Sequence, residues 1–193
     1  MEWAIPAQLF TSTAAQISAP AKHQKPMASL GYSDELFSMP ALSILLPFLP
    51  VKAYEPDTGK LALSLAGYPS ILTKLHAFQN KMLVTIHANY TIWFPGERTR
   101  SIEETTSSFQ PFIQGGCIHL YCPLVTTGSF NEISMYSGGS WTKGVIPSNT
   151  FAIGKQIRIA IKLQGISFHQ HPVTRNLTGR SRVQHRILAI YKS

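Results

Sequence analysis

The last third of the chain combines basic side chains with a complete lack of acidic ones, a pattern that suits phosphate binding. All 9 acidic residues precede Ile133, so residues 133–193 carry a net charge of +9 and residues 1–132 carry −1. Arginine, the commoner basic residue after position 170, offers a planar fork of donors that matches phosphate oxygens. The candidate sites for phosphate, lipid headgroups or nucleic acid are Lys143, Arg158, Lys162, Arg175, Arg180, Arg182 and Arg186. The weaker alternative is that the basic segment binds nothing, because basic surfaces without a ligand normally also carry acidic residues.

Cysteine and histidine offer two further kinds of chemistry. Cys117 and His119 share one face of a predicted strand, which is the minimum that Cys–His catalysis needs, although a histidine so placed is more often structural. Cys122 falls on the opposite face, so we expect two separate buried thiols in a reducing compartment. His169 and His171 also share a face, but no cysteine or carboxylate lies near them in sequence. We therefore expect no metal site, and histidines that face solvent or phosphate.

The sequence contains no motif of the common catalytic or cofactor-binding classes. It has no phosphate-cradling glycine loop, no dinucleotide fingerprint and no G-x-S-x-G elbow. It also lacks the aromatic octamer and the GXXG clamp of RNA-binding modules. We therefore expect no catalytic residue and no cofactor, and contact that is driven by charge rather than by base sequence.

Composition excludes several classes of protein. The chain has 193 residues, of which 44% are hydrophobic and 13% charged, so it has the size and apolar content of one domain with a sizeable core. Two cysteines exclude a disulfide scaffold, and no apolar run is long enough to span a bilayer. The first residues lack a basic start followed by an apolar run, which predicts a protein that is not secreted. The glycosylation patterns at Asn89 and Asn176 are then expected to be chance matches.

Patterning divides the chain into residues 1–40, a flexible arm rich in Ala, Ser, Thr, Gln and Pro, and residues 41–193, a globular domain. Residues 51–55 and 60–66 flank a turn-forming Pro-Asp-Thr-Gly run and predict a hairpin. A helix should begin at Tyr68-Pro69, because Ile71, Leu75, Phe78 and Met82 then form one apolar stripe.

The remaining predicted elements are strands and loops. Alternation of apolar and polar residues predicts strands over 82–94, 116–125, 151–168 and 187–191. Loops are predicted over 96–108, 126–150 and 169–184, and the second of them has room for a short strand. Gly165 is expected to mark a bulge or bend. The predicted fold is an α+β, antiparallel β-rich single domain with one main amphipathic helix packed on the sheet and a flexible N-terminal arm.

This layout resembles the matrix proteins of rhabdoviruses and their relatives among negative-strand RNA viruses. The resemblance covers residues 48–168 and rests on the helix YPSILTKLHAFQNKM and the late strand FAIGKQIRIAIKLQG. It implies a non-enzymatic viral structural protein with a basic surface that binds anionic membrane and viral ribonucleoprotein or RNA, and that forms homo-oligomers during assembly. It also implies a place in the virion and the host cell, on the inner membrane face or in the cytoplasm or nucleus. Unlike those proteins, the chain has no Pro-Pro-x-Tyr motif in its arm, and its arm is not rich in lysine.

Two alternatives remain open. The same basic segment suits a nucleic-acid-binding viral protein of the coat, movement or silencing-suppressor type, which would bind RNA without binding vesicles. A small β-rich enzyme or lectin would instead depend on Cys117 and His119.

Overall fold

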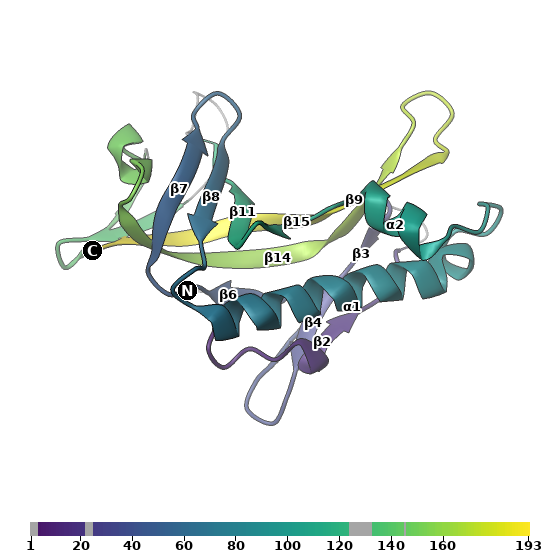
Figure 1. Cartoon of the computed structure of the whole chain (residues 1–193), viewed down its shortest axis with the longest axis horizontal. Coiled ribbons are helices and arrows are strands. Elements are labelled where there is room, and N and C mark those ends of the chain that lie inside the picture. The colour runs from purple at the N-terminus through teal and green to yellow at the C-terminus, as the bar shows by residue number, and fades with distance from the viewer. Residues whose placement is uncertain (1–3, 22–24, 124–132, 145) are drawn as a thin grey trace.

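Two long antiparallel strands, β14 (Gln156–Gln170) and β15 (Leu177–Lys192), run the length of the molecule (Figure 1). The computed structural model describes residues 4–21, 25–123, 133–144 and 146–193. Within them the two long strands organise a mostly antiparallel sheet, and one long helix packs on it. The predicted β-rich α+β single domain is confirmed.

The other strands are short and extend this pair on both sides. The same sheet contains β1 (Ile5–Pro6), β3 (Met27–Ala28), β6 (Ser43–Leu45), β7 (Leu49–Glu55), β8 (Lys60–Ser64), β9 (Phe109–Gln110), β10 (Ile113–Gln114), β11 (Cys117–Tyr121), β12 (Ser134–Ser137) and β13 (Ser140–Lys143). One edge of β14 pairs in turn with β7, β6 and β3, whereas the far edge of β15 pairs with β12 and β9. A second sheet contains β2 (Ala15–Ile17), β4 (Leu30–Ser33) and β5 (Ser38–Met39), and two 3-10 turns are η1 (Ser12–Ala14) and η2 (Ser148–Phe151).

The helix α1 (Pro69–Trp93) covers one side of the long strand pair (Figure 1). It begins where the sequence predicts, because proline in the first turn has no amide hydrogen to lose. The predicted stripe of Ile71, Leu75, Phe78 and Met82 is buried. The helix therefore supplies a continuous apolar stripe to the core. Among the described residues, neither helix combines the length and the apolar character that crossing a bilayer requires.

The strand predicted over residues 82–94 is wrong, because α1 continues through this segment. The apolar residues of 82–94 fit both the period of a helix and the period of a strand. Met82, Ile86 and Tyr90 recur every four positions and are buried on the helix, whereas Ile92, which should face inward with them in a strand, is 72% exposed. Extending an existing helix needs no new nucleus, so the helical period wins here.

The described part of residues 1–40 is integrated into the fold and is not an arm outside it. Phe10 packs against Phe78 of α1 and Tyr32 of β4, with ring centroids 5.4 and 5.7 Å apart. Lys81 of α1 donates hydrogen bonds to backbone carbonyls at the start of the chain. The core residues that this segment supplies are Ile5, Ala7, Phe10, Ala15, Ala28, Leu30 and Tyr32. Its strands span two to four residues, too few to show a period in the sequence.

Two predicted loops contain regular structure. The loop over 96–108 includes a second helix, α2 (Ile102–Ser108), and the basic loop over 169–184 is largely the first half of β15. The region 126–150 contains the β12–β13 hairpin around Gly138-Gly139, although residues 126–132 and 145 lie outside the described part.

The strand predicted over 151–168 begins later than expected, at Gln156, because Phe151 ends the turn η2 and residues 152–155 are not strand. The remaining predicted elements are found where they were expected. The β7–β8 hairpin and the central part of the strand over 116–125 are confirmed, as is the closing strand over 187–191, which is the end of β15. Gly165 sits at a register irregularity in β14, which confirms the predicted bulge.

Candidate polyanion-binding site

Three arginines of β15 share one face of the sheet. Arg180, Arg182 and Arg186 are exposed, whereas the alternate residues of the strand point toward the core. Lys162 of β14 lies directly opposite Arg186 in the register. We call these four residues the basic ladder. Much of the predicted loop is therefore a paired strand, which fixes the spacing of the backbone positions that carry these arginines.

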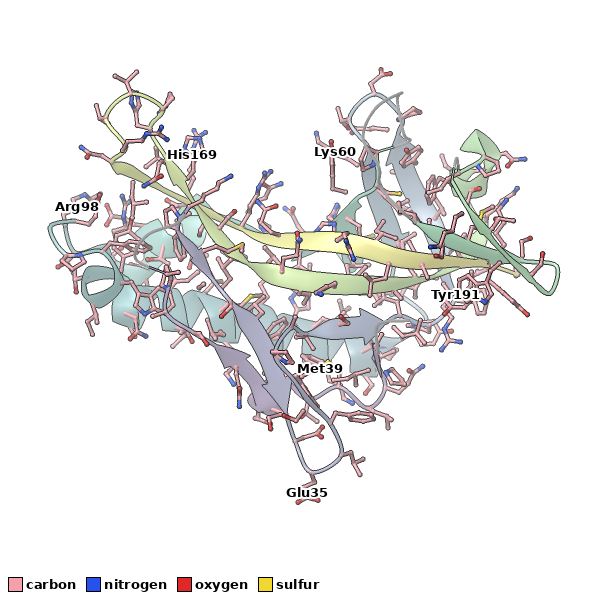
Figure 2. The ribbon with its side chains drawn as sticks, turned by 180° about the vertical axis from the view of Figure 1, so that it is seen from behind. Glu35, Met39, Lys60, Arg98, His169 and Tyr191 are labelled. Carbon is pink, nitrogen blue, oxygen red and sulfur yellow. The ribbon has the colours of Figure 1, made fainter. Side chains whose placement is uncertain are left out.

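The basic ladder lies on the side of the sheet that faces away from α1. Figure 2 shows side chains with nitrogen ends rising from β14 and β15 between two raised rims. One rim is the loop that follows His169, and the other is the β7–β8 hairpin that carries Lys60 (Figure 2). The face between the rims is therefore concave along the strands.

A hollow of about 570 Å³ lies at one end of this face. It reaches from the residues before β3, across β14 and β15, to β9 and α2. Its polar lining consists of Lys25, Ser107, Ser108, Gln110, Ser167, His169, Thr178, Arg180, Ser181, Arg182 and Gln184. None of the described residues that line it is acidic. Guanidinium, ammonium, hydroxyl and amide groups together provide the donors that phosphate oxygens accept.

An adjoining hollow of about 620 Å³ brings in the loop between the long strands. Lys25 and His169 line both hollows, and Arg175 lines the second one. Arg175 has a left-handed backbone (φ 62°) in a turn closed by its amide, which donates to His171 O at 2.9 Å. Sequence reasoning placed Lys25 in an arm and missed its position at the site. Nothing in its local sequence signals that position.

Of the seven predicted residues, only Arg175, Arg180 and Arg182 line a hollow. Lys162 and Arg186 lie along the strands outside both hollows, and so do the two remaining candidates, Arg158 and Lys143. Arg158 lies near the other end of β14, where its Nε donates to Leu46 O at 3.2 Å and its guanidinium lies 5.9 Å from the centre of the Tyr191 ring. Lys143 is exposed at the end of β13. The seven predicted residues are therefore spread along one sheet and do not form one pocket.

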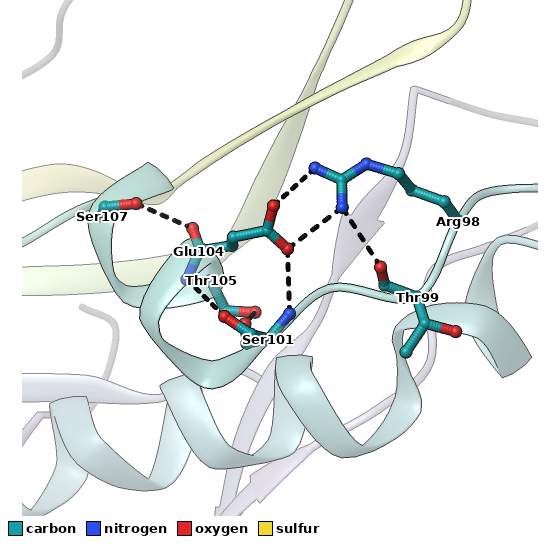
Figure 3. A network of polar contacts seen from close by, with 6 residues as sticks. All are labelled: Arg98, Thr99, Ser101, Glu104, Thr105 and Ser107. Carbon is teal, nitrogen blue, oxygen red and sulfur yellow. Dashed lines mark hydrogen bonds and ion pairs between the residues drawn. The ribbon is translucent and has the colours of Figure 1, made fainter.

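The α2 wall of the hollow is fixed by a network of charges and caps. Figure 3 shows Ser101 and Glu104 forming a capping box, in which the Ser101 Oγ accepts from the Glu104 amide at 3.1 Å and Glu104 Oε2 accepts from the Ser101 amide at 3.0 Å. Arg98 donates to both oxygens of Glu104, which lowers the pKa of that carboxyl to about 2. Ser107 and Ser108 then project from the end of α2. The S-x-x-E spacing was the signal that could have revealed this helix.

The cysteines and the other histidines that the structure describes have structural surroundings. Burial raises the pKa of the Cys122 thiol to about 12, so this cysteine stays protonated. Cys117 is half-buried, and the Nε2 of His119 lies 3.3 Å from Gln114 O. The Nδ1 of His171 accepts from two backbone amides of its own turn. Among the described residues, no group of three histidine, cysteine or acidic side chains is placed to hold a metal ion.

His185 is a structural residue that sequence reasoning did not single out. Its Nε2 accepts a hydrogen bond from the Tyr121 amide at 2.7 Å, which links β15 to β11. Burial lowers the pKa of this imidazole to about 4, so the ring is neutral at pH 7. It therefore adds no charge to the strand that carries the basic ladder.

Comparison with known proteins gives no relative: no family model, no curated protein and no solved structure matched the chain. The resemblance to matrix proteins stays a hypothesis, and the geometry of the basic face carries the functional argument.

Proposed function

We propose that this protein is a non-enzymatic structural protein of the matrix type, and that it binds the RNA of a ribonucleoprotein through the basic ladder. The observation that supports this most is the donor-rich hollow, in which Arg180 and Arg182 stand beside Lys25 and His169 with no acidic lining residue among those described. Such a surface attracts phosphate and gains affinity as counterions leave the nucleic acid. Because these arginines are on a paired strand, no backbone needs to be ordered when they bind, and only the side chains lose freedom.

The curvature of the face favours RNA over a bilayer as its ligand. Both rims rise beyond the strands between them (Figure 2), so a flat membrane would meet the rims before it met the basic ladder. A single strand of RNA is narrow and flexible enough to lie along the basic ladder, between the two rims. A matrix-type protein would then bind the membrane through the rims or through another surface. Its self-association would leave the face between the rims free for RNA.

The second candidate is a nucleic-acid-binding viral protein of the coat, movement or silencing-suppressor type. The same curvature favours it, because such a protein needs no membrane surface. The two candidates share the basic ladder and differ only in their second partner.

Paired co-sedimentation separates them. Single-stranded RNA is used in one series and phosphatidylserine vesicles in the other, each at low and at raised salt. RNA binding that weakens with salt, together with vesicle binding and concentration-dependent self-association, supports the matrix type. RNA binding alone supports the second candidate. Failure to bind RNA at low salt would contradict both.

A further inference from the structure

The sheet carries a row of aromatic side chains at the opposite end from the hollow. Tyr191 of β15, Tyr136 of β12 and Trp141 of β13 are register partners on three adjacent strands. Their ring centroids lie 5.2 to 6.0 Å apart, so each ring contacts the other two. We call these three residues the aromatic row. Arg158 continues it on the fourth strand, because it lies directly opposite Tyr191.

The aromatic row is partly open to solvent. Trp141 is 41% exposed and sits on β13, the last strand in the order of the sheet, and both tyrosines are half-buried. Packing between the rings explains how the β12–β13 hairpin holds its register. It does not explain why the largest ring of the row stays exposed, since burial would contribute more to stability.

The row and the basic ladder belong to one face. Arg158 and Lys162 are four residues apart on β14, and the extra residue at the irregularity between them, Leu188, is on β15. Both side chains are therefore on the same side of β14, while the isoleucines between them are buried. Figure 2 labels His169 and Tyr191 near the two opposite ends of the long strand pair. From Arg158 to Ser167 the strand covers about 30 Å, a span of several nucleotides.

We infer that the aromatic row is a base-stacking site and that the ligand of the whole face is single-stranded nucleic acid. Every base presents a π-face, so stacking needs no particular sequence. The phosphates would follow the basic ladder toward the hollow, and Arg158 would stand beside the stacked base. Double-stranded nucleic acid keeps its bases inside the duplex and offers none to the row. The inference rests on the proposed RNA binding and adds the place where the bases of the single strand stack.

The sharpest test compares two labelled oligonucleotides of equal length, single-stranded polyuridine and an abasic ribose-phosphate chain. Both carry the same phosphates, and only one carries bases. We expect the wild-type protein to bind polyuridine roughly tenfold more tightly, as loss of one stacking contact typically costs. Equal, salt-dependent affinity for the two would overturn the stacking site and leave the proposed function standing. Binding of neither would overturn the proposed function itself.

Single substitutions show which residue makes the protein prefer polyuridine to the abasic chain. Trp141→Ala should lower the affinity for polyuridine toward that for the abasic chain, and Trp141→Phe, which retains a ring, should keep most of the preference. Arg182→Gln should lower the affinity for polyuridine and for the abasic chain by a similar factor. Circular dichroism of each variant checks that the fold is intact. A preference for bases that survives in Trp141→Ala would overturn the assignment, as would a Trp141→Ala variant that loses only its binding to phosphatidylserine vesicles.

Discussion

The imidazole of His185 makes the stability of this protein depend on pH between about pH 4 and 6.5. The unfolded chain titrates this residue near its ordinary pKa of 6.5, whereas the folded protein does so near 4. Between these values the unfolded state binds more protons, so acid favours unfolding and stability falls as the pH drops. At roughly 1.4 kcal/mol per pH unit, we expect His185 to contribute on the order of 3 kcal/mol at pH 7 that is lost by about pH 4. Urea unfolding across this range measures it.

The matched control is His185→Gln. Glutamine retains an oxygen that can accept from the Tyr121 amide, which the imidazole does at 2.7 Å, and it does not titrate. Subtracting its pH profile from that of the wild type removes the contribution of the other histidines. Identical profiles for the two proteins would show that His185 has the same pKa in both states.

A buried amide side chain joins α1 to the sheet. Gln79 is 8% exposed, its Oε1 accepts from the amides of Phe112 and Ile113 at 3.0 Å each, and its Nε2 donates to Ile113 O at 3.1 Å. Gln79→Leu would leave these three backbone groups unpaired. We expect it to lower the free energy of unfolding by about 2–4 kcal/mol, measured in urea. Asn80→Ala, one residue along and exposed, should change it by less than about 0.5 kcal/mol. Equal effects would contradict this role for Gln79.

At the residue scale, the sequence predicted which segment is basic, but it did not predict which residues from other segments lie beside it. The basic side chains of β15 stand out because no acid follows Glu132. Lys25 and Gln184 line the same hollow, yet nothing in their own neighbourhood marks them. Lys25 reaches the site only because β3 pairs with β14, a contact between segments far apart in the chain.

At the scale of elements, Gly165 sets how closely β3 approaches β14. Its φ of 156° and its surroundings exclude a side chain, since an added Cβ would lie 2.5 Å from Ala28 O and 2.7 Å from Met27 Cγ. We expect Gly165→Ala to destabilise the fold by roughly 2–3 kcal/mol. Gly67→Ala is the control, because no atom lies within 4 Å of the added Cβ there. Thermal unfolding of both variants tests this, and equal midpoints would contradict the close approach.

Element type was predictable where one period dominated. The stripe from Ile71 to Met82 and the alternation of isoleucine and basic residues in β14 both predicted the correct element. The segment 82–94 fitted two periods, and the choice depended on the helix that precedes it. The first half of β15 was taken for a loop because it alternates arginine with Ser, Gly and Val, residues that are buried only once β14 lies beside them.

At the scale of the whole molecule, the N-terminal segment is part of the core. Deleting residues 1–40 should abolish cooperative unfolding, because the truncated chain loses Ile5, Phe10 and Tyr32, all of which are fully buried. The change in near-ultraviolet circular dichroism on heating measures this. A sharp transition in the truncated protein would restore the picture of a dispensable arm.

A pair of adjacent substitutions checks the same point without a deletion. Phe10→Ala should cost about 3–5 kcal/mol, because the ring packs between α1 and β4. Leu9, its neighbour, is 51% exposed, so Leu9→Ala should cost far less. Similar losses in urea unfolding would contradict the packing of Phe10.

The salt dependence of RNA binding tests most directly whether the basic ladder contacts the phosphates of RNA. The affinity for a labelled single-stranded RNA is measured across a series of salt concentrations for the wild type and for two triple variants, in which Arg180, Arg182 and Arg186 are all changed to Gln or all to Lys. If the ladder contacts phosphate, the slope of log affinity against log salt should shrink by about 2 in the glutamine variant, at about 0.7 per lost contact. The lysine variant should keep the slope of the wild type, since it keeps the charges. An unchanged slope in the glutamine variant would show that the RNA lies elsewhere.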